Sequence, residues 1–159
     1  MPDSNTALEE RLQRLEDLEA IRRLFLDYGR YLDTKEFGPC SELFAEDGEF
    51  VLPFDTVKGP EGVRKVMDDM LGRDLAAKPG KDLHLFANPI VDLDGDQATA
   101  RSFWIYVTPN DEGFPQVAQF GHYEDVVVRV DGSWKFKRRD AQRDIGIPGA
   151  GVEQASKAS

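Results

Sequence analysis

Apolar residues recur every three or four positions over a long stretch near the start of this 159-residue chain. They are Leu8, Leu12, Leu15, Leu18, Ile21, Phe25, Tyr28 and Leu32. This spacing lines one face of a helix, so the sequence predicts a long N-terminal helix with an apolar face. The early part of the stripe is a narrow leucine seam among charged residues. That seam fits either a helix packed on a partner subunit or an exposed helical arm.

Two shorter helices and a strand are predicted next. One helix covers residues 34–44 and the other covers residues 59–72, with a strand at residues 48–54 between them. The second of these helices has its own apolar stripe, made of Val63, Val66, Met67 and Met70.

The sequence changes character after Pro79, where β-branched and aromatic residues alternate with polar ones. This alternation predicts strands at residues 83–94, 97–108, 116–130 and 133–142. The dipeptides Asp94-Gly95 and Asp131-Gly132 favour tight turns, because both accept positive φ angles. At least two of the joints between these strands should therefore be antiparallel hairpins.

Helices followed by a meander of strands predict an α+β fold, with the helices on one face of a curved, mixed but mainly antiparallel sheet. A strongly bent sheet closed by the N-terminal helices forms a cone-shaped barrel, and its cavity would suit a small apolar ligand. The length predicts one domain, over residues 1–145. Residues 146–159 are small and polar and predict a flexible C-terminal tail.

The composition excludes several functions. The chain has 20 Lys and Arg against 30 Asp and Glu, and a net charge of -10 repels nucleic acids and anionic lipids. No signal peptide or membrane span is visible, which predicts a soluble, cytoplasmic protein. With the single cysteine Cys40 and two histidines, there is no recognisable metal-binding spacing, and no cofactor is expected.

The two histidines are candidates for chemistry. His84 begins a predicted strand, shares a face with Phe86, and could accept a substrate proton near neutral pH. It could equally be a partly buried residue bonded to the backbone. His122 lies in the middle of a predicted strand and could point to either face, so a structural or surface role is favoured.

Asp33 lies near the end of the first predicted helix, where a carboxylate is electrostatically unfavourable. It could be the N-cap of the second helix, with Glu36 completing a capping box. A capping carboxylate has acceptor sites to spare, so Asp33 could also hold an imidazole.

Tyr28 lies on the apolar stripe and should point into the core, where its hydroxyl needs a partner. Arg139 follows Trp134 and Phe136 in a predicted strand. A bulge would be needed to turn Arg139 inward, and otherwise it should be solvated. The remaining aromatic residues fit either core or pocket lining, and they are Phe50, Phe54, Phe86, Trp104, Phe120 and Tyr123.

Five segments, taken in order, resemble the SnoaL-like branch of the nuclear transport factor 2-like superfamily. They are LEAIRRLFLDYGRYLD, CSELFAEDGEF, VKGPEGV, HLFANPIVDLDGDQATARSFW and GHYEDVVVRVDGSWKFKRR. The resemblance implies a cone-shaped α+β barrel that forms a homodimer or homotrimer and takes a small apolar, ring-containing molecule.

Members with this pattern include scytalone dehydratase and bile-acid 7α-dehydratase, which are cofactor-free lyases. The resemblance implies that His84 takes a proton from a carbon next to an electron-withdrawing group, while Asp33 fixes the imidazole tautomer. It implies that Tyr28 donates to the departing hydroxyl or a carbonyl oxygen, and that Arg139 holds a negative oxygen. The substrate-binding residues would then be Phe54, Phe86, Trp104, Phe120 and His122.

Other functions fit the same fold. A ketosteroid-isomerase-like enzyme would use Asp33 or Asp47 to shuttle a proton without losing a group. A protein that only binds a ligand or partner predicts an apolar cavity and no contact between Asp33 and His84, whereas a lyase predicts a hydrogen bond between them within reach of an open volume. A further alternative is an accessory subunit of an aromatic-ring dioxygenase.

Overall fold

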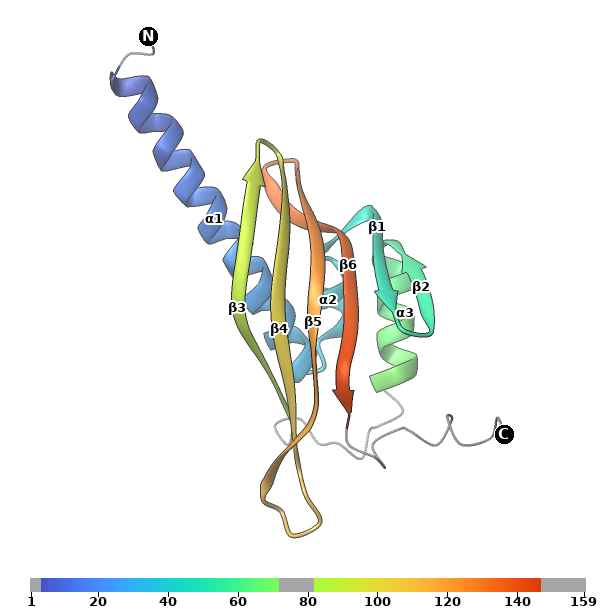
Figure 1. Ribbon diagram of the computed structural model, residues 1–159. Coiled ribbons are helices and arrows are strands. Elements are labelled where there is room, and N and C mark those ends of the chain that lie inside the picture. The colour runs from blue at the N-terminus through green and yellow to red at the C-terminus, as the bar shows by residue number, and fades with distance from the viewer. Residues whose placement is uncertain (1–3, 72–81, 147–159) are drawn as a thin grey trace.

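Three helices and six strands make up the described part of the chain, residues 4–71 and 82–146, in a computed structural model (Figure 1). In chain order they are α1 (Ser4–Asp33), α2 (Phe37–Ser41), β1 (Phe44–Leu52), β2 (Asp55–Lys58), α3 (Gly59–Leu71), β3 (Leu83–Asp94), β4 (Gln97–Pro109), β5 (Pro115–Val130) and β6 (Ser133–Gly146). The predicted α+β class is confirmed. From residue 147 onward, the predicted tail lies outside the described residues.

The described strands form one mixed sheet in the order β2-β1-β6-β5-β4-β3. β1 and β6 run parallel, and the other neighbours are antiparallel. Gly95 (φ 59°) and Gly132 (φ 80°) adopt the left-handed conformation at the β3–β4 and β5–β6 turns, which confirms both predicted hairpins. The helices lie on one face of the curved sheet (Figure 1). Its edge strands β2 and β3 do not pair with each other, so the sheet is not a closed barrel.

The two halves of α1 have different surroundings. The apolar residues that it buries are Ile21, Leu24, Phe25, Tyr28 and Leu32. Leu8, Leu12 and Leu15 are instead 61%, 54% and 64% exposed, and the N-terminal half of the helix extends beyond the sheet (Figure 1). The prediction of one continuous apolar face is therefore wrong for its first part. A step of three residues turns about 300°, which falls about 60° short of a full turn. Three such steps in succession, from Leu12 to Ile21, therefore move the apolar stripe from one face of the helix to another.

The segment after α1 departs from the prediction. α2 has five residues instead of spanning 34–44, because the chain turns at Lys35, which adopts the left-handed conformation (φ 61°). β1 begins at Phe44, earlier than predicted, and the short strand β2 was missed. α3 confirms the third predicted helix and buries Val63 and Met67 against the core.

Aromatic side chains from α1, β1 and β6 form the centre of the core. The rings of Phe25 and Phe136 stack with centroids 5.7 Å apart, and the ring of Phe44 lies 5.1 Å from that of Phe136. Such rings bury large apolar areas and prefer defined relative orientations. Their packing holds α1 across the sheet and therefore determines where its last turn ends.

A buried carboxylate also connects α1 to the β5–β6 hairpin. Asp17 accepts hydrogen bonds from Arg129 Nη2 (2.7 Å), Trp134 Nε1 (3.1 Å) and Gln13 Nε2 (3.2 Å). Burial alone would raise the pKa of Asp17, but the hydrogen bonds from Arg129 and Trp134 outweigh burial and lower the pKa. The ionised form of Asp17 is therefore favoured by folding.

Asp17→Ala is expected to lower the free energy of unfolding by about 2 kcal/mol at pH 7, because it leaves the buried Trp134 N–H unpaired. The pKa of Asp17 lies below its unfolded-state value of about 3.9, so this contribution is present above that pH and is lost as the pH falls through the folded-state pKa. Urea unfolding at pH 7 and at lower pH measures both effects. Asp111→Ala, at an exposed position, is the control, and an equal loss in both variants would contradict the prediction.

Candidate active site

Asp33, the last residue of α1, binds His84, the second residue of β3. Asp33 Oδ1 lies 2.7 Å from His84 Nδ1, and the carboxylate oxygens accept the His84 backbone N–H at 3.0 and 3.1 Å. Asp33 does not cap α2, whose N-cap position is occupied by Glu36 without a side-chain hydrogen bond. The carboxylate at the negative end of α1 is therefore directed to the imidazole.

The contact with Asp33 determines which ring nitrogen of His84 carries the proton. An ionised carboxylate can only accept, so neutral His84 holds its proton on Nδ1 and has a lone pair on Nε2. Among residues 4–71 and 82–146, none forms a hydrogen bond with that Nε2. The side chains of His84 and Asp33 are 14% and 17% exposed, so the pair is neither sealed in the core nor freely solvated.

A second polar group borders this pair and was missed by the sequence analysis. The ring of Tyr106 stacks on that of His84 with centroids 4.5 Å apart, and the Tyr106 hydroxyl donates to Asp82 Oδ2 at 2.7 Å. Lys35 Nζ lies 3.0 Å from the same oxygen. Burial would raise the pKa of Asp82, but the hydrogen bonds from Tyr106 and Lys35 outweigh it and lower the pKa. This network holds one face of the imidazole in place.

Tyr28 lies deeper, on the buried face of α1. It is 1% exposed, and its ring packs edge to face with the rings of Phe86 and Tyr123, at centroid distances of 6.1 and 6.0 Å. Phe86 is also 6.3 Å from the His84 ring, so it connects the Asp33–His84 pair with the interior around Tyr28. Burial raises the pKa of Tyr28 well above its usual value, and the hydroxyl therefore stays protonated.

Arg139 is turned into the core by an irregularity in β6. The β5–β6 register shifts next to Phe136, so that Phe136 and Arg139 are both fully buried. This is the bulge that an inward Arg139 requires. Its guanidinium carbon lies 4.1 Å from the ring centroid of Tyr28 and 3.7 Å from that of Tyr123.

A buried carboxylate accompanies this guanidinium. Asp125 Oδ2 is 3.5 Å from Arg139 Nη2, and both side chains are inaccessible to solvent. Burial raises the pKa of Asp125 to about 6, although the positive charge of Arg139 opposes the shift. No described residue accepts a hydrogen bond from Nε, Nη1 or Nη2 of Arg139. The guanidinium therefore has donors available for a further oxygen.

Three of the predicted substrate-binding residues lie apart from the Asp33–His84 pair. Phe54 is 66% exposed in the turn between β1 and β2. Phe120 and His122 alternate along β5 with buried residues that face α1, so they point to the face that the helices do not cover. On that face His122 Nδ1 lies 2.7 Å from Asp144 Oδ2. The structure does not bring these three residues to the pair.

Phe86 and Trp104 are on the inner face with the pair, and Trp104 has a buried Nε1–H without a described partner. Around Tyr28 and Arg139 the interior is filled by aromatic rings. Tyr28 and Arg139 are therefore surrounded by packed rings and do not line the predicted cavity.

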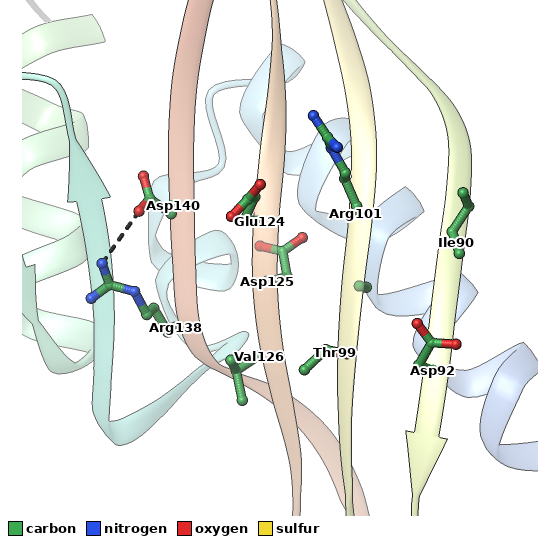
Figure 2. Close-up of a pocket in the computed structure, with 10 residues that line it drawn as sticks. Ile90, Asp92, Thr99, Arg101, Glu124, Asp125, Val126, Arg138 and Asp140 are labelled. Carbon is green, nitrogen blue, oxygen red and sulfur yellow. Dashed lines mark hydrogen bonds and ion pairs between the residues drawn. The ribbon is translucent and has the colours of Figure 1, made fainter.

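Two hollows lie elsewhere on the surface. Figure 2 shows one of about 460 Å³ on the uncovered face of the sheet, where Arg101, Glu124 and Asp140 line it. None of the predicted catalytic residues lines this hollow. A second hollow, of about 200 Å³, is lined by Asp82 and Leu83, immediately before His84 in the chain. Neither Asp33 nor His84 lines this smaller hollow.

Within residues 4–71 and 82–146, no three His, Cys, Asp or Glu side chains are grouped as metal ligands would be. The same part of the chain contains no helix long and apolar enough to cross a membrane.

Several solved structures share this fold over most of their length. An NTF2-like protein with a cystatin-like fold from Novosphingobium aromaticivorans is 30% identical, with a TM-score of 0.81 over 94% of this chain and 96% of that one. A candidate scytalone dehydratase from the same organism is 27% identical, with a TM-score of 0.70 over 84% and 88%. LinA is 25% identical, with a TM-score of 0.75 over 89% and 95%. No curated protein matches the chain.

The family comparison covers the candidate site. The model of the SnoaL-like domain matches residues 13–140, a range that runs from α1 to β6 and includes Asp33 and His84. The chain therefore belongs to the SnoaL-like family within the NTF2-like superfamily.

Proposed function

We propose that the chain is a cofactor-independent lyase that removes water from a small apolar, ring-containing molecule. The observation that carries this proposal is the 2.7 Å contact between Asp33 Oδ1 and His84 Nδ1, which leaves the other ring nitrogen free to accept a proton. Similarity to a candidate scytalone dehydratase, at 27% identity, supports the same class of reaction.

In the proposed reaction, His84 Nε2 takes a proton from a carbon next to a carbonyl group. The electron pair of that C–H bond forms a carbon–carbon double bond by way of an enolate, while the bond from the neighbouring carbon to its hydroxyl breaks. The departing hydroxide takes the proton from the imidazolium and leaves as water, which regenerates neutral His84. Asp33 keeps Nδ1 protonated and stabilises the transient positive charge.

In the proposed reaction, Tyr28 and Arg139 bind the carbonyl oxygen of the substrate. The Tyr28 hydroxyl stays protonated and Arg139 has donors without described partners, so both can stabilise a negative oxygen in a dry interior. Phe86 and Trp104, on the same inner face, would contact the ring of the substrate. This part of the proposal requires the substrate to reach past Phe86.

The proposal can be tested with a panel of cyclic β-hydroxy ketones in D₂O. We expect deuterium at the carbon next to the carbonyl and the absorbance of a conjugated enone, and His84→Gln should lower both rates by about 10² to 10⁴-fold. His122→Gln is the matched control, because His122 lies on the other face of the sheet. Enone formation at the wild-type rate in His84→Gln would remove the basis of the proposal.

The same assay separates the alternatives. Movement of a double bond without loss of water would favour a proton-shuttling isomerase. Asp47, one of the two bases named for that reaction, is exposed and ion-paired with Lys137, which makes it a poor candidate. A protein that only binds ligand was expected to keep Asp33 and His84 apart, and their hydrogen bond goes against it.

A further inference from the structure

α1 carries a second apolar face that no part of the described chain covers. Leu8, Leu12, Leu15 and Leu26 are 61%, 54%, 64% and 47% exposed. With about 100° of rotation per residue, these four leucines lie on the side of the helix opposite to the residues that pack on the sheet. In Figure 1 the first turns of α1 extend past the sheet, and Asp17 is the first buried residue of the helix. A helical segment of about a dozen residues is only marginally stable in water by itself.

The exposed leucines share one heptad register. Leu12 and Leu26 fall at a positions, and Leu8 and Leu15 fall at d positions. Asn5 occupies the preceding a position, where an Asn in a parallel two-stranded coiled coil meets its symmetry mate and fixes the register. The pattern is therefore that of a helix that pairs with another helix.

Charged residues on the two flanks of this face indicate which helix it pairs with. Arg11 lies at a g position, and Glu9 and Glu16 lie at e positions on the other flank. None of the three forms an ion pair within the described chain, whereas charged residues later in α1 do. In a parallel pair of identical helices, Arg11 of each copy faces Glu16 of the other. In an antiparallel pair, e positions face e positions and g positions face g positions, so Arg11 and Glu16 would not face each other.

We propose that the leucine seam (Leu8, Leu12 and Leu15) binds the same seam of a second copy of this chain as a parallel two-stranded coiled coil. The sheet packs on the opposite side of each helix, so the two sheets would lie on the outside of the pair. The proposal does not depend on the lyase reaction, because Asp33 and His84 lie at the other end of α1.

Light scattering coupled to gel filtration tests this pairing. The wild-type chain should elute with twice the mass of one chain, and Leu12→Glu should raise the dissociation constant of the dimer at least 100-fold. Because Leu12 is 54% exposed in the single chain, the monomeric variant should remain folded by circular dichroism. Leu85→Glu is the matched control, since Leu85 is 47% exposed on β3. A monomeric wild type, or a dimer that only Leu85→Glu dissociates, would overturn the proposal.

Charge exchange tests the parallel orientation. Arg11→Glu and Glu16→Arg should each weaken the dimer about tenfold, and the double variant should restore it, because two like-charged contacts become opposite-charged again. In an antiparallel pair the double variant would restore nothing.

An engineered disulfide gives an independent check. Leu8→Cys should form a covalent dimer under mild oxidation only if the two Leu8 positions face each other. In an antiparallel pair Leu8 would lie opposite an a position such as Leu12, so the two Leu8 positions would be displaced by at least four residues, or about 6 Å along the axis, in addition to the distance between the helices, which a disulfide cannot bridge. The native Cys40 will not compete, because it is fully buried and burial raises its pKa to about 12. Absence of the covalent dimer would overturn the parallel arrangement.

Discussion

Asp33→Asn is expected to lower kcat of the proposed elimination by about 10³-fold while leaving the fold intact. The wild-type carboxylate accepts both the backbone N–H and the Nδ1–H of His84. An Asn would keep its carbonyl oxygen for the backbone N–H and present its NH₂ group to Nδ1. That nitrogen would then have to accept, the proton would move to Nε2, and His84 would lose the lone pair that acts as the base.

The decisive measurement combines kcat with the ¹⁵N chemical shifts of the His84 ring. The proton should move from Nδ1 to Nε2 in the variant, and kcat should fall with it. Asp27→Asn is the matched control, because Asp27 is on the same helix and pairs with Arg23 at the surface. Full turnover by Asp33→Asn despite the exchanged tautomer would mean that His84 is not the base.

The order of strands was predictable where a turn is encoded locally. Asp94-Gly95 and Asp131-Gly132 each define a hairpin through residues that tolerate positive φ, and both hairpins are present. The strand β2 could not be found in the same way, since its four residues carry little alternation and depend on pairing with β1. Local turn chemistry is therefore readable from the sequence, while strands formed by pairing alone are not.

The contact between Asp33 and His84 was predictable from residue types and from the family resemblance, but its surroundings were not. Counting back from the turn pair Asp94 and Gln97 would place Val107 opposite His84. A bulge in β3, where Asn88 has a φ of 52°, shifts the register and puts Tyr106 there instead. Such a shift is a property of the assembled hairpin, so the stacking residue of the site could not be identified from spacing.

The residues around Arg139 could not be identified from spacing either, because they also depend on the register of the assembled sheet. The sequence showed that an inward Arg139 requires a bulge, and the structure has one. The partner Asp125 stands in the apolar context DVVV and lies directly opposite Arg139 in the β5–β6 register, which only the assembled sheet reveals. A buried acid of this kind is recognisable once its strand partner is known.

Gly121→Ala is expected to lower the free energy of unfolding by about 3 kcal/mol. A Cβ atom at this position would clash with the backbone oxygen of Gln142 and would lie 2.7 Å from the ring of Trp104. The oxygen belongs to β6 and cannot move without separating β5 from β6, next to the point where their register shifts. Glycine is therefore required here by the close approach of a neighbouring strand, and urea unfolding at pH 7 measures the cost of replacing it.

Gly62→Ala is the matched control for Gly121→Ala. A Cβ at Gly62, in α3, would meet the side chain of Val57 at an ordinary distance of 3.5 Å, and Ala is the better helix former. This variant should therefore gain about 0.5–1 kcal/mol. Combining Gly121→Ala with Trp104→Leu distinguishes the two obstacles, because the smaller side chain relieves only the contact with the ring. If Gly121→Ala cost no stability in the Trp104→Leu background, the backbone of β6 would not be the obstacle, and the tight β5–β6 approach would not be what requires glycine.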